Sequence, residues 1–204
     1  KGHGSICLYP ILADRGFFPR EELLRVCRQG GILGGIPDPV IPGYETVNGS
    51  LGHGLGVGAG MALGTRRMGA ARNVFVLCGD GELHEGAMWE AIMFAAHHGL
   101  DNLNLIVDDN RIAMLGRTEE MLAHGDLAAR LAAFGWDAQV VADGHDIALV
   151  HGALSAMKAR RDGRPKAVIA RTIKGRGLPG IEDMPLSHVM APRPEDVVRL
   201  LGEA

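Results

Sequence analysis

Residues 73–86, NVFVLCGDGELHEG, and residues 103–110, LNLIVDDN, decide the fold of this 204-residue chain. Each stretch begins with a short apolar run, Asn73–Cys78 or Leu103–Val107, whose brevity and β-branched content predict a buried strand. Between them, Glu85–His98 has the length and the pattern of a helix. A strand, a helix and a second strand in this order predict two parallel strands whose carboxyl ends share one edge of a sheet.

The same alternation continues on both sides of this unit. Helices are expected at Ser5–Ala13, Pro19–Arg28, Leu51–Leu63, Asp126–Phe134, Asp146–Arg161 and Pro194–Leu201, and strands at Trp136–Val141 and Lys166–Ile173. Two long loops, Gly30–Gly49 and Gly175–Pro192, interrupt the pattern. The predicted fold class is therefore α/β, a parallel sheet with helices on both faces.

Composition and charge exclude several classes of protein. Apolar residues make up 47% of the chain and charged residues 22%, which predicts a folded domain rather than a disordered chain. A net charge of −3 disfavours a general nucleic-acid binder, and no apolar run is long enough to cross a membrane. Three cysteines in apolar surroundings, Cys7, Cys27 and Cys78, disfavour a disulfide scaffold and predict a cytoplasmic location.

Glycine is the unusual feature of the composition. The chain has 30 glycines, about twice the average share, and they are clustered. The expected helix Leu51–Leu63 alone carries five, and each costs roughly 1 kcal/mol in a helix interior. We expect this helix to pack closely against another backbone or a cofactor.

Polar residues follow both strands of the central unit. Asp80 comes directly after the first strand, and Asn110 follows it by thirty residues, after the second. One carboxylate and one amide oxygen suit Mg²⁺, which completes its shell with phosphate oxygens and water. Gly79 and Gly81 would let phosphate oxygens approach the backbone, and the helix that begins near Glu85 would add a favourable dipole. A plain Gly-Asp-Gly turn with Asn110 as a cap is the alternative, and the strand context favours the metal.

The run from Gly79 to Asn110 resembles the thiamine-diphosphate motif, which opens with Gly-Asp-Gly and closes with Asn. Further motifs resemble those of the transketolase family in the same order along nearly all of the chain. They are KGHG (1–4), PGYE (42–45), GSLGHGLG (49–56), GDGELHEG (79–86), WEA (89–91), FGW (134–136), DGHD (143–146) and TIKGRG (172–177).

The resemblance covers only the diphosphate-binding part of a transketolase. It implies that residues 1–204 form a single diphosphate-binding domain with the thiamine-diphosphate-binding fold, without the pyrimidine-binding and C-terminal domains. The chain is then the first subunit of a split transketolase, expected to form an α2β2 heterotetramer with a second subunit. The implied enzyme transfers a two-carbon ketol unit from a ketose phosphate to an acceptor, and needs its partner for activity.

By the same resemblance, Asp80 and Asn110 bind Mg²⁺, or Ca²⁺ or Mn²⁺ in its place, through their side chains, and Ile112 through its carbonyl. The implied cofactor-binding residues are Gly49, Leu51, Gly79, Asp80, Gly81, Glu82, Asn110 and Ile112. His3 and His188 match histidines near the diphosphate and the reacting carbon. Glu85 and Glu90 match acids of the hydrogen-bonded network between two active sites, so the implied catalytic set is His3, His188, Glu85 and Glu90.

Two positions depart from the family pattern. Where transketolases commonly have a histidine that contacts substrate hydroxyls, this chain has Ile36, which cannot form a side-chain hydrogen bond. We therefore expect a donor of altered polarity, or one that is held differently. His53 stands where glutamine is usual.

Two other functions compete with this interpretation. The α-subunit of a 2-oxo-acid dehydrogenase, or another acyl-transferring thiamine enzyme, shares the Gly-Asp-Gly motif, but the segments 1–4 and 49–56 favour transketolase. A non-catalytic regulatory partner is the other alternative. The joint presence of Asp80, Asn110, Glu85 and His3 argues against it.

Overall fold

The computed structural model describes residues 1–178 and 180–202, except for the side chain of Ser5. The contacts divide the chain into two compact units, Lys1–Gly54 and Leu55–Ala204, and each is described by itself. No helix in the described part of the chain is long and apolar enough to cross a membrane.

The first unit is built from short helices and a long loop. Its helical elements are the 3₁₀ helix η1 (Gly2–Cys7), the α-helix α1 (Leu8–Asp14) and the 3₁₀ helix η2 (Arg20–Arg25). A small apolar core holds them together, formed by Tyr9, Ala13, Phe18, Leu33 and Ile41. The Tyr9 hydroxyl donates a hydrogen bond to the Gly34 carbonyl at 2.6 Å, which fixes the glycine-rich loop onto α1.

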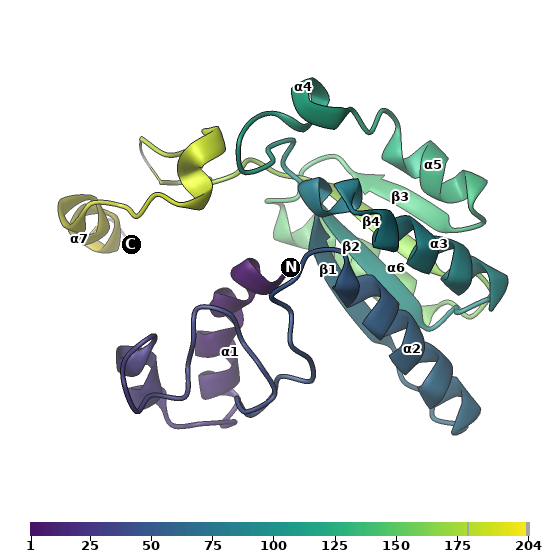
Figure 1. Ribbon diagram of the computed structural model, residues 1–204, viewed down its shortest axis with the longest axis horizontal. Helices are drawn as coiled ribbons and strands as arrows, with labels where there is room; N and C mark the ends of the chain where they lie inside the picture. Colours follow the sequence, from purple (N-terminus) through teal and green to yellow (C-terminus); the bar gives the residue numbers. More distant parts are fainter. Residues whose placement is uncertain (179, 203–204) are drawn as a thin grey trace. The chain divides into compact units, whose positions relative to one another are not determined.

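The second unit contains the sheet (Figure 1). In chain order its elements are α2 (His53–Arg67, which begins at the end of the first unit), β1 (Val74–Gly79), η3 (Asp80–His84), α3 (Gly86–His97), β2 (Leu103–Asp109), α4 (Thr118–Leu122), α5 (Leu127–Ala133), β3 (Asp137–Val141), α6 (Ile147–Ala159), β4 (Lys166–Arg171), η4 (Pro185–His188) and α7 (Pro194–Gly202). The four strands are all parallel, in the order β1-β2-β4-β3.

Helices lie on both faces of this sheet, as predicted. Side chains of α2, α3 and α5 form one core with the inward residues of the strands, such as Cys78 and Leu105. On the opposite face, Met157 of α6 packs on Val168 of β4. The same face of β1 is only partly covered in the described chain, because Phe75 and Leu77 are 44% and 43% exposed.

The expected helix Ser5–Ala13 is split between η1 and α1, and two other short helical segments also differ from expectation. The helix expected at Pro19–Arg28 is the shorter 3₁₀ helix η2, and the left-handed backbone of Cys27, with a φ of 56°, stops any continuation. The five-residue helix α4 was not expected from the sequence. Such a short helix has too few residues to show a hydrophobic period.

The glycines of α2 have different environments. A Cβ on Gly58 would lie 2.4 Å from Cγ2 of Val76, so this glycine lets the helix lie directly on β1. A Cβ on Gly56, Gly60 or Gly64 would meet no atom of the described residues within 4 Å. Close packing therefore explains one glycine of this helix and leaves the outer ones unexplained within the chain.

This contrast predicts opposite effects of two alanine substitutions in one helix. Gly58→Ala should lower the free energy of unfolding by about 1–2 kcal/mol, because the clash with Val76 outweighs the gain in helix propensity. Gly60→Ala should raise it by roughly 0.5–1 kcal/mol, since the added methyl meets nothing. Urea denaturation of the isolated chain measures both, and a stabilised Gly58→Ala variant would contradict the packing.

Candidate functional site

The carboxyl ends of β1 and β2 meet at one edge of the sheet. The parallel register pairs Gly79 with Asp108, so the chain leaves the two strands at neighbouring points, into Asp80 on one side and Asn110 on the other. A Cβ on Gly81 would lie 3.5 Å from the Cα and Cβ atoms of Ala113. The turn after β1 and the loop after β2 therefore lie against each other, as the spacing predicted.

Asp80 carries a buried carboxylate with an unsatisfied oxygen. The residue is 1% exposed, and its Oδ2 atom has no hydrogen-bond partner among the described residues. Burial raises the pKa of this carboxyl, and the neighbouring charge of Asp109 raises it further. Leaving a buried acceptor unpaired costs stability, so the site holds a charge that a cation would compensate.

Asn110 and Ile112 are held by a tight turn. The Asn110 Oδ1 atom accepts a hydrogen bond from the Ile112 backbone N–H at 3.0 Å, and its Nδ2 atom donates to Asp108 at 3.3 Å. Between them Arg111 adopts a left-handed φ of 61°. Ile112 is 3% exposed. These contacts fix the orientation of the amide at the edge where Asp80 lies.

The donor set at this edge fits a divalent cation that is shared with a phosphate. No cluster of three or more His, Cys, Asp or Glu side chains in the described part of the chain could hold a metal ion. One carboxylate, one amide oxygen and a backbone carbonyl are hard oxygen ligands, which suit Mg²⁺, Ca²⁺ or Mn²⁺. They leave coordination positions open, and the unpaired Oδ2 of Asp80 is the observation that fits a bound cation.

Two histidines that the sequence analysis did not single out support this edge. The His124 Nε2 atom lies 2.9 Å from the Asp80 carbonyl, and the His84 Nε2 atom lies 2.9 Å from the Leu122 carbonyl. Their ring centroids are 4.5 Å apart. Burial lowers the pKa of His124, and His84 lowers it further. Since a carbonyl oxygen can only accept, the Nε2–H group of His124 donates to Asp80 and ties the turn to the segment after α4.

Two other carboxylates at the edge, Asp108 and Asp109, are paired within the sheet. Asp109, which is 4% exposed, forms an ion pair with Arg171, and the Thr172 hydroxyl hydrogen-bonds to Asp108. Both contacts join the end of β2 to the end of β4. Asp80 therefore differs from Asp108 and Asp109, because its Oδ2 atom has no hydrogen-bond partner among the described residues, as is also true of Oε2 of Glu82.

The DGHD segment (143–146) forms the turn between β3 and α6. A Cβ on Gly144 would lie 2.6 Å from Thr172 Cγ2 and 2.8 Å from the Arg171 carbonyl, so only glycine fits there. The Ile173 N–H donates to His145 Nε2 at 2.8 Å, and Asp146 caps the first turn of α6. In the structure this motif closes the turn onto the end of β4.

In the first unit, two of the sequence motifs lie side by side. A Cβ on Gly2 would lie 1.8 Å from the Asn48 carbonyl oxygen, so the segment 1–4 packs directly on the segment that contains Gly49 and Leu51. His3 and Leu51 are exposed. Ile36 is 44% exposed, and its Cγ2 atom lies 3.6 Å from the position of a Cβ on Gly49.

The remaining site residues lie on elements around the sheet. Glu82 is buried in η3, and Glu85 is the exposed residue that precedes α3. Glu90 is exposed on α3 itself. His188 ends η4 and is half-buried, on the segment that leads from β4 toward α7 (Figure 1).

Residues 1–202 match the sequence profile of the family described as transketolase, thiamine diphosphate binding domain. One of the subunits of apulose-4-phosphate transketolase from Actinobacillus succinogenes is 38% identical over 204 residues, which cover 100% of this chain and 73% of that protein. Human transketolase is 38% identical over 189 residues, which cover 92% of this chain and 30% of that protein.

Solved structures agree with these matches. A transketolase from Pichia stipitis in complex with sedoheptulose 7-phosphate superposes with a TM-score of 0.89 at 30% identity, covering 99% of this chain and 31% of that one. Transketolase from Leishmania mexicana gives a TM-score of 0.87 at 27% identity. The chain thus spans about a third of these transketolases and nearly three quarters of the Actinobacillus relative.

The unpaired oxygen of Asp80 predicts that an amide is better tolerated than a carboxylate in the metal-free chain. Asp80→Asn should raise the free energy of unfolding by roughly 1–2 kcal/mol, because the variant no longer buries an uncompensated charge. Urea denaturation in the presence of a chelator measures this. Glu120→Gln, an exposed change on α4, is the control and should shift it by less than about 0.5 kcal/mol. A destabilised Asp80→Asn variant would show that the carboxylate is already compensated.

Proposed function

Since this chain belongs to the transketolase family, we propose that it is the thiamine-diphosphate- and Mg²⁺-binding subunit of a two-component transketolase. The complex would transfer a two-carbon ketol unit from a ketose phosphate donor to an acceptor. The observation that carries this proposal is the unpaired, buried Oδ2 of Asp80 at the edge that also presents Asn110. Two relatives that match this chain along all of its length are each named as one subunit of a transketolase, which supports the two-component form.

In this proposal the second unit holds the diphosphate end of the cofactor. Asp80, Asn110 and the Ile112 carbonyl bind the Mg²⁺, while Gly79, Gly81 and Glu82 line the diphosphate. The assignment of Gly49 and Leu51 to the rings of the cofactor rests on the motif at residues 49–56. Thiamine diphosphate, when bound, supplies the carbon nucleophile and the electron sink for breaking and forming the carbon–carbon bond.

The protein contributes binding, orientation and proton transfer. His3 and His188 would hold or move protons near the diphosphate and the reacting carbon. The contact of His124 with the Asp80 carbonyl fixes the turn that presents the metal ligand. Positioning of this kind lowers the barrier because the reacting groups need no reorganisation at the moment of reaction.

We propose that the rest of the active site comes from a second subunit, in an α2β2 assembly. The exposed Glu85 and Glu90 have no ion-pair partner among the described residues, and they flank an outer face of α3 that also exposes Met93 and Phe94. The outer glycines of α2 would allow a close approach by another chain. Cys7, Cys27 and the buried Cys78 form no disulfide among the described residues, and we propose a reducing, cytoplasmic location.

This assembly predicts that the isolated chain has no transketolase activity. Addition of a purified pyrimidine-domain subunit should restore turnover and bring the mass to that of a heterotetramer. Coupled transketolase assays and light scattering measure the two effects. Asn110→Ala should weaken Mg²⁺-dependent cofactor binding in the reconstituted complex by about tenfold or more, because one side-chain ligand is lost. Full activity of the isolated chain, or acyl transfer from a 2-oxo acid in place of ketol transfer, would refute the proposal.

Ile36 predicts an altered choice of donor. If the site lacks the usual histidine contact, the complex should use xylulose 5-phosphate poorly, and Ile36→His should improve it relative to the natural donor. The expected gain is that of one neutral hydrogen bond, roughly 0.5–1.5 kcal/mol, or about two- to tenfold in kcat/KM. Ile36→Leu is the control and should change nothing. Efficient use of xylulose 5-phosphate by the unaltered complex, with no change in Ile36→His, would show that another residue makes the contact.

A further inference from the structure

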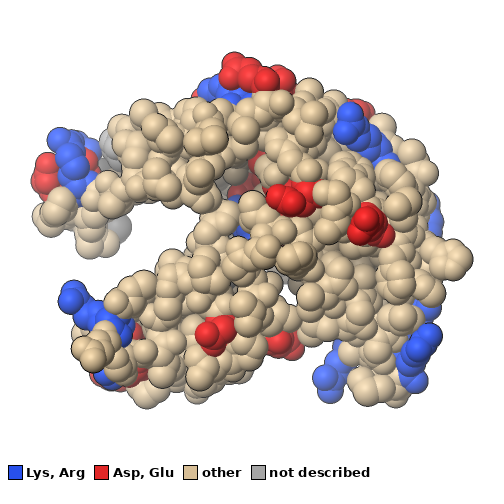
Figure 2. All heavy atoms as spheres, in the orientation of Figure 1, with Lys and Arg blue, Asp and Glu red and all other residues tan. Residues whose placement is uncertain are grey.

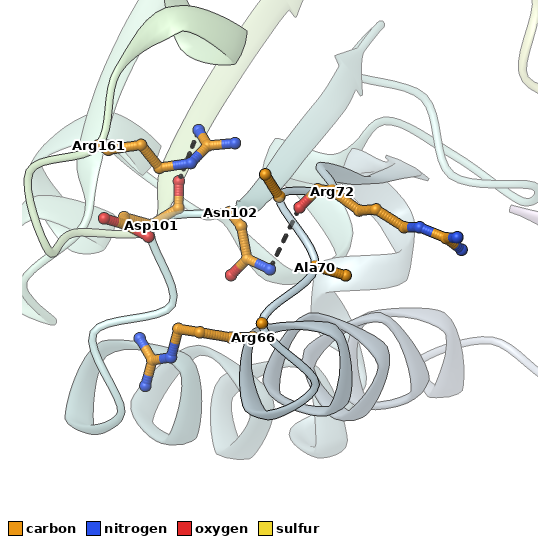
Figure 3. A pocket seen from close by; sticks show the side chains of 8 residues that line it. Arg66, Ala70, Arg72, Asp101, Asn102 and Arg161 are labelled. Atoms are coloured by element: carbon orange, nitrogen blue, oxygen red, sulfur yellow. Dashed lines mark hydrogen bonds between the residues drawn. The ribbon is translucent and has the colours of Figure 1, made fainter.

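A basic pocket lies at the opposite end of the same two strands. It has a volume of about 270 Å³ and is lined by Arg66, Gly69, Ala70, Ala71, Arg72, Asp101, Asn102 and Arg161. These residues lie at the end of α2, before β1, before β2 and after α6 (Figure 3). Strands β1 and β2 begin here and run toward Asp80 and Asn110, so the pocket lies at the amino edge of the sheet and the candidate active site at the carboxyl edge.

The arginines of this pocket are held in place but not neutralised. Arg66 donates to the carbonyls of His98 and Gly99 at 2.7 and 2.8 Å. Arg161 donates to the Arg160 carbonyl and to Asn73 Oδ1, both at 2.8 Å, and also to the carbonyls of Lys158 at 3.2 Å and Asp101 at 3.5 Å. Among the described residues, neither of them nor Arg72 forms an ion pair with a carboxylate. In Figure 2, basic side chains gather at the lower right, where α2 ends in Figure 1.

The local charge favours an anion. Three arginines and one aspartate line the pocket, which leaves a formal charge of +2. The aspartate, Asp101, already accepts a hydrogen bond from the Gly163 N–H at 3.1 Å. The C-terminal ends of α2, α3 and α6 lie near this pocket and carry at most about half a negative charge each, which together stays below the net positive charge of the lining side chains. Each guanidinium has five N–H donors, so several remain free to meet an anionic oxygen.

The side-chain amide of Asn102 also lines the pocket. Asn102 is 5% exposed and donates through Nδ2 to the Ala62 carbonyl at 2.9 Å, while its Oδ1 atom has no partner among the described residues. Figure 3 shows the amide nitrogen directed at the Arg72 carbonyl and the oxygen on the other side. The Oδ1 atom is itself buried from solvent, so this residue shapes the wall of the pocket and does not offer a contact to a ligand.

We propose that this pocket is a second binding site, separate from the candidate active site, for the phosphate group of a small phosphorylated compound. Guanidinium groups bind phosphate oxygens through paired, charge-assisted hydrogen bonds. The volume can hold the phosphate group of a small compound such as a phosphate ester of a short polyol.

The test is an NMR titration of the isolated, ¹⁵N-labelled chain without Mg²⁺. Inorganic phosphate and glycerol 3-phosphate are added separately, with sodium chloride at matched ionic strength as the reference. Both phosphates should shift the amide signals of Gly69–Arg72 and Asp101–Asn102, and sodium chloride should not. Tighter binding of glycerol 3-phosphate identifies an esterified ligand, and equal or tighter binding of inorganic phosphate identifies the free ion.

Arg72 is the residue to change, because its exposed side chain has no contact in the described structure that folding would need. Arg72→Gln should weaken phosphate binding roughly three- to tenfold. Arg72→Lys should weaken it less, because lysine keeps the positive charge but cannot form the paired hydrogen bonds of a guanidinium group. Arg67→Gln is the control. It also removes one positive charge, but from a residue of α2 that does not line the pocket, and it should leave phosphate binding unchanged.

Three results would overturn the proposal. Signals at Gly69–Arg72 and Asp101–Asn102 that stay fixed at high phosphate would show that the pocket binds no phosphate. Equal shifts with sodium chloride would show that only ionic strength is sensed. An equal loss in Arg67→Gln and Arg72→Gln would show that the effect comes from the general charge of the surface. None of these results depends on the metal, the cofactor or the partner subunit.

Discussion

The parallel register of β1 and β2 is the constraint on which the rest of the candidate site depends. It pairs Gly79 with Asp108, and so Asp80 and Asn110 leave the sheet at neighbouring points. The helix α3 that joins the strands is tied to β3, since the Trp136 Nε1 atom donates to the Ile92 carbonyl at 2.9 Å. A slip by one residue would turn every inward side chain of a strand to the other face, so the core holds the ligands in place.

Much of this fold follows from local patterns in the sequence. The short apolar runs predict the strands to within two residues at either end, and Asp126 and Asp146 mark the starts of α5 and α6 because their side chains cap the first turns. The position of β4 between β2 and β3 cannot be predicted from such local patterns. It depends on which strands bury each other's faces over long separations, and no local period carries that information.

Some residues of the candidate site can likewise be predicted from the local sequence, and others cannot. Asp80 and Asn110 can be predicted because each directly follows a strand, and the ends of neighbouring parallel strands share an edge. His124 cannot be predicted, because it reaches the Asp80 carbonyl across 44 residues that include α3, β2 and α4. The DGHD segment is instructive in another respect. Its Gly144 and His145 are explained by contacts with residues 171–173, so a motif shared with a family can serve the fold rather than the chemistry.

Two glycines of this chain differ in how evolution could replace them. Gly58 is closely approached by a side-chain methyl of Val76, and a smaller residue at that position would make room for a new Cβ. Gly2 is closely approached by the main-chain oxygen of Asn48, which every amino acid carries. No second substitution can remove that atom, so a lineage could leave glycine at position 2 only by moving the backbone of one segment. The first position is open to paired mutations, whereas the second is closed to any sequence of single replacements that keeps this backbone.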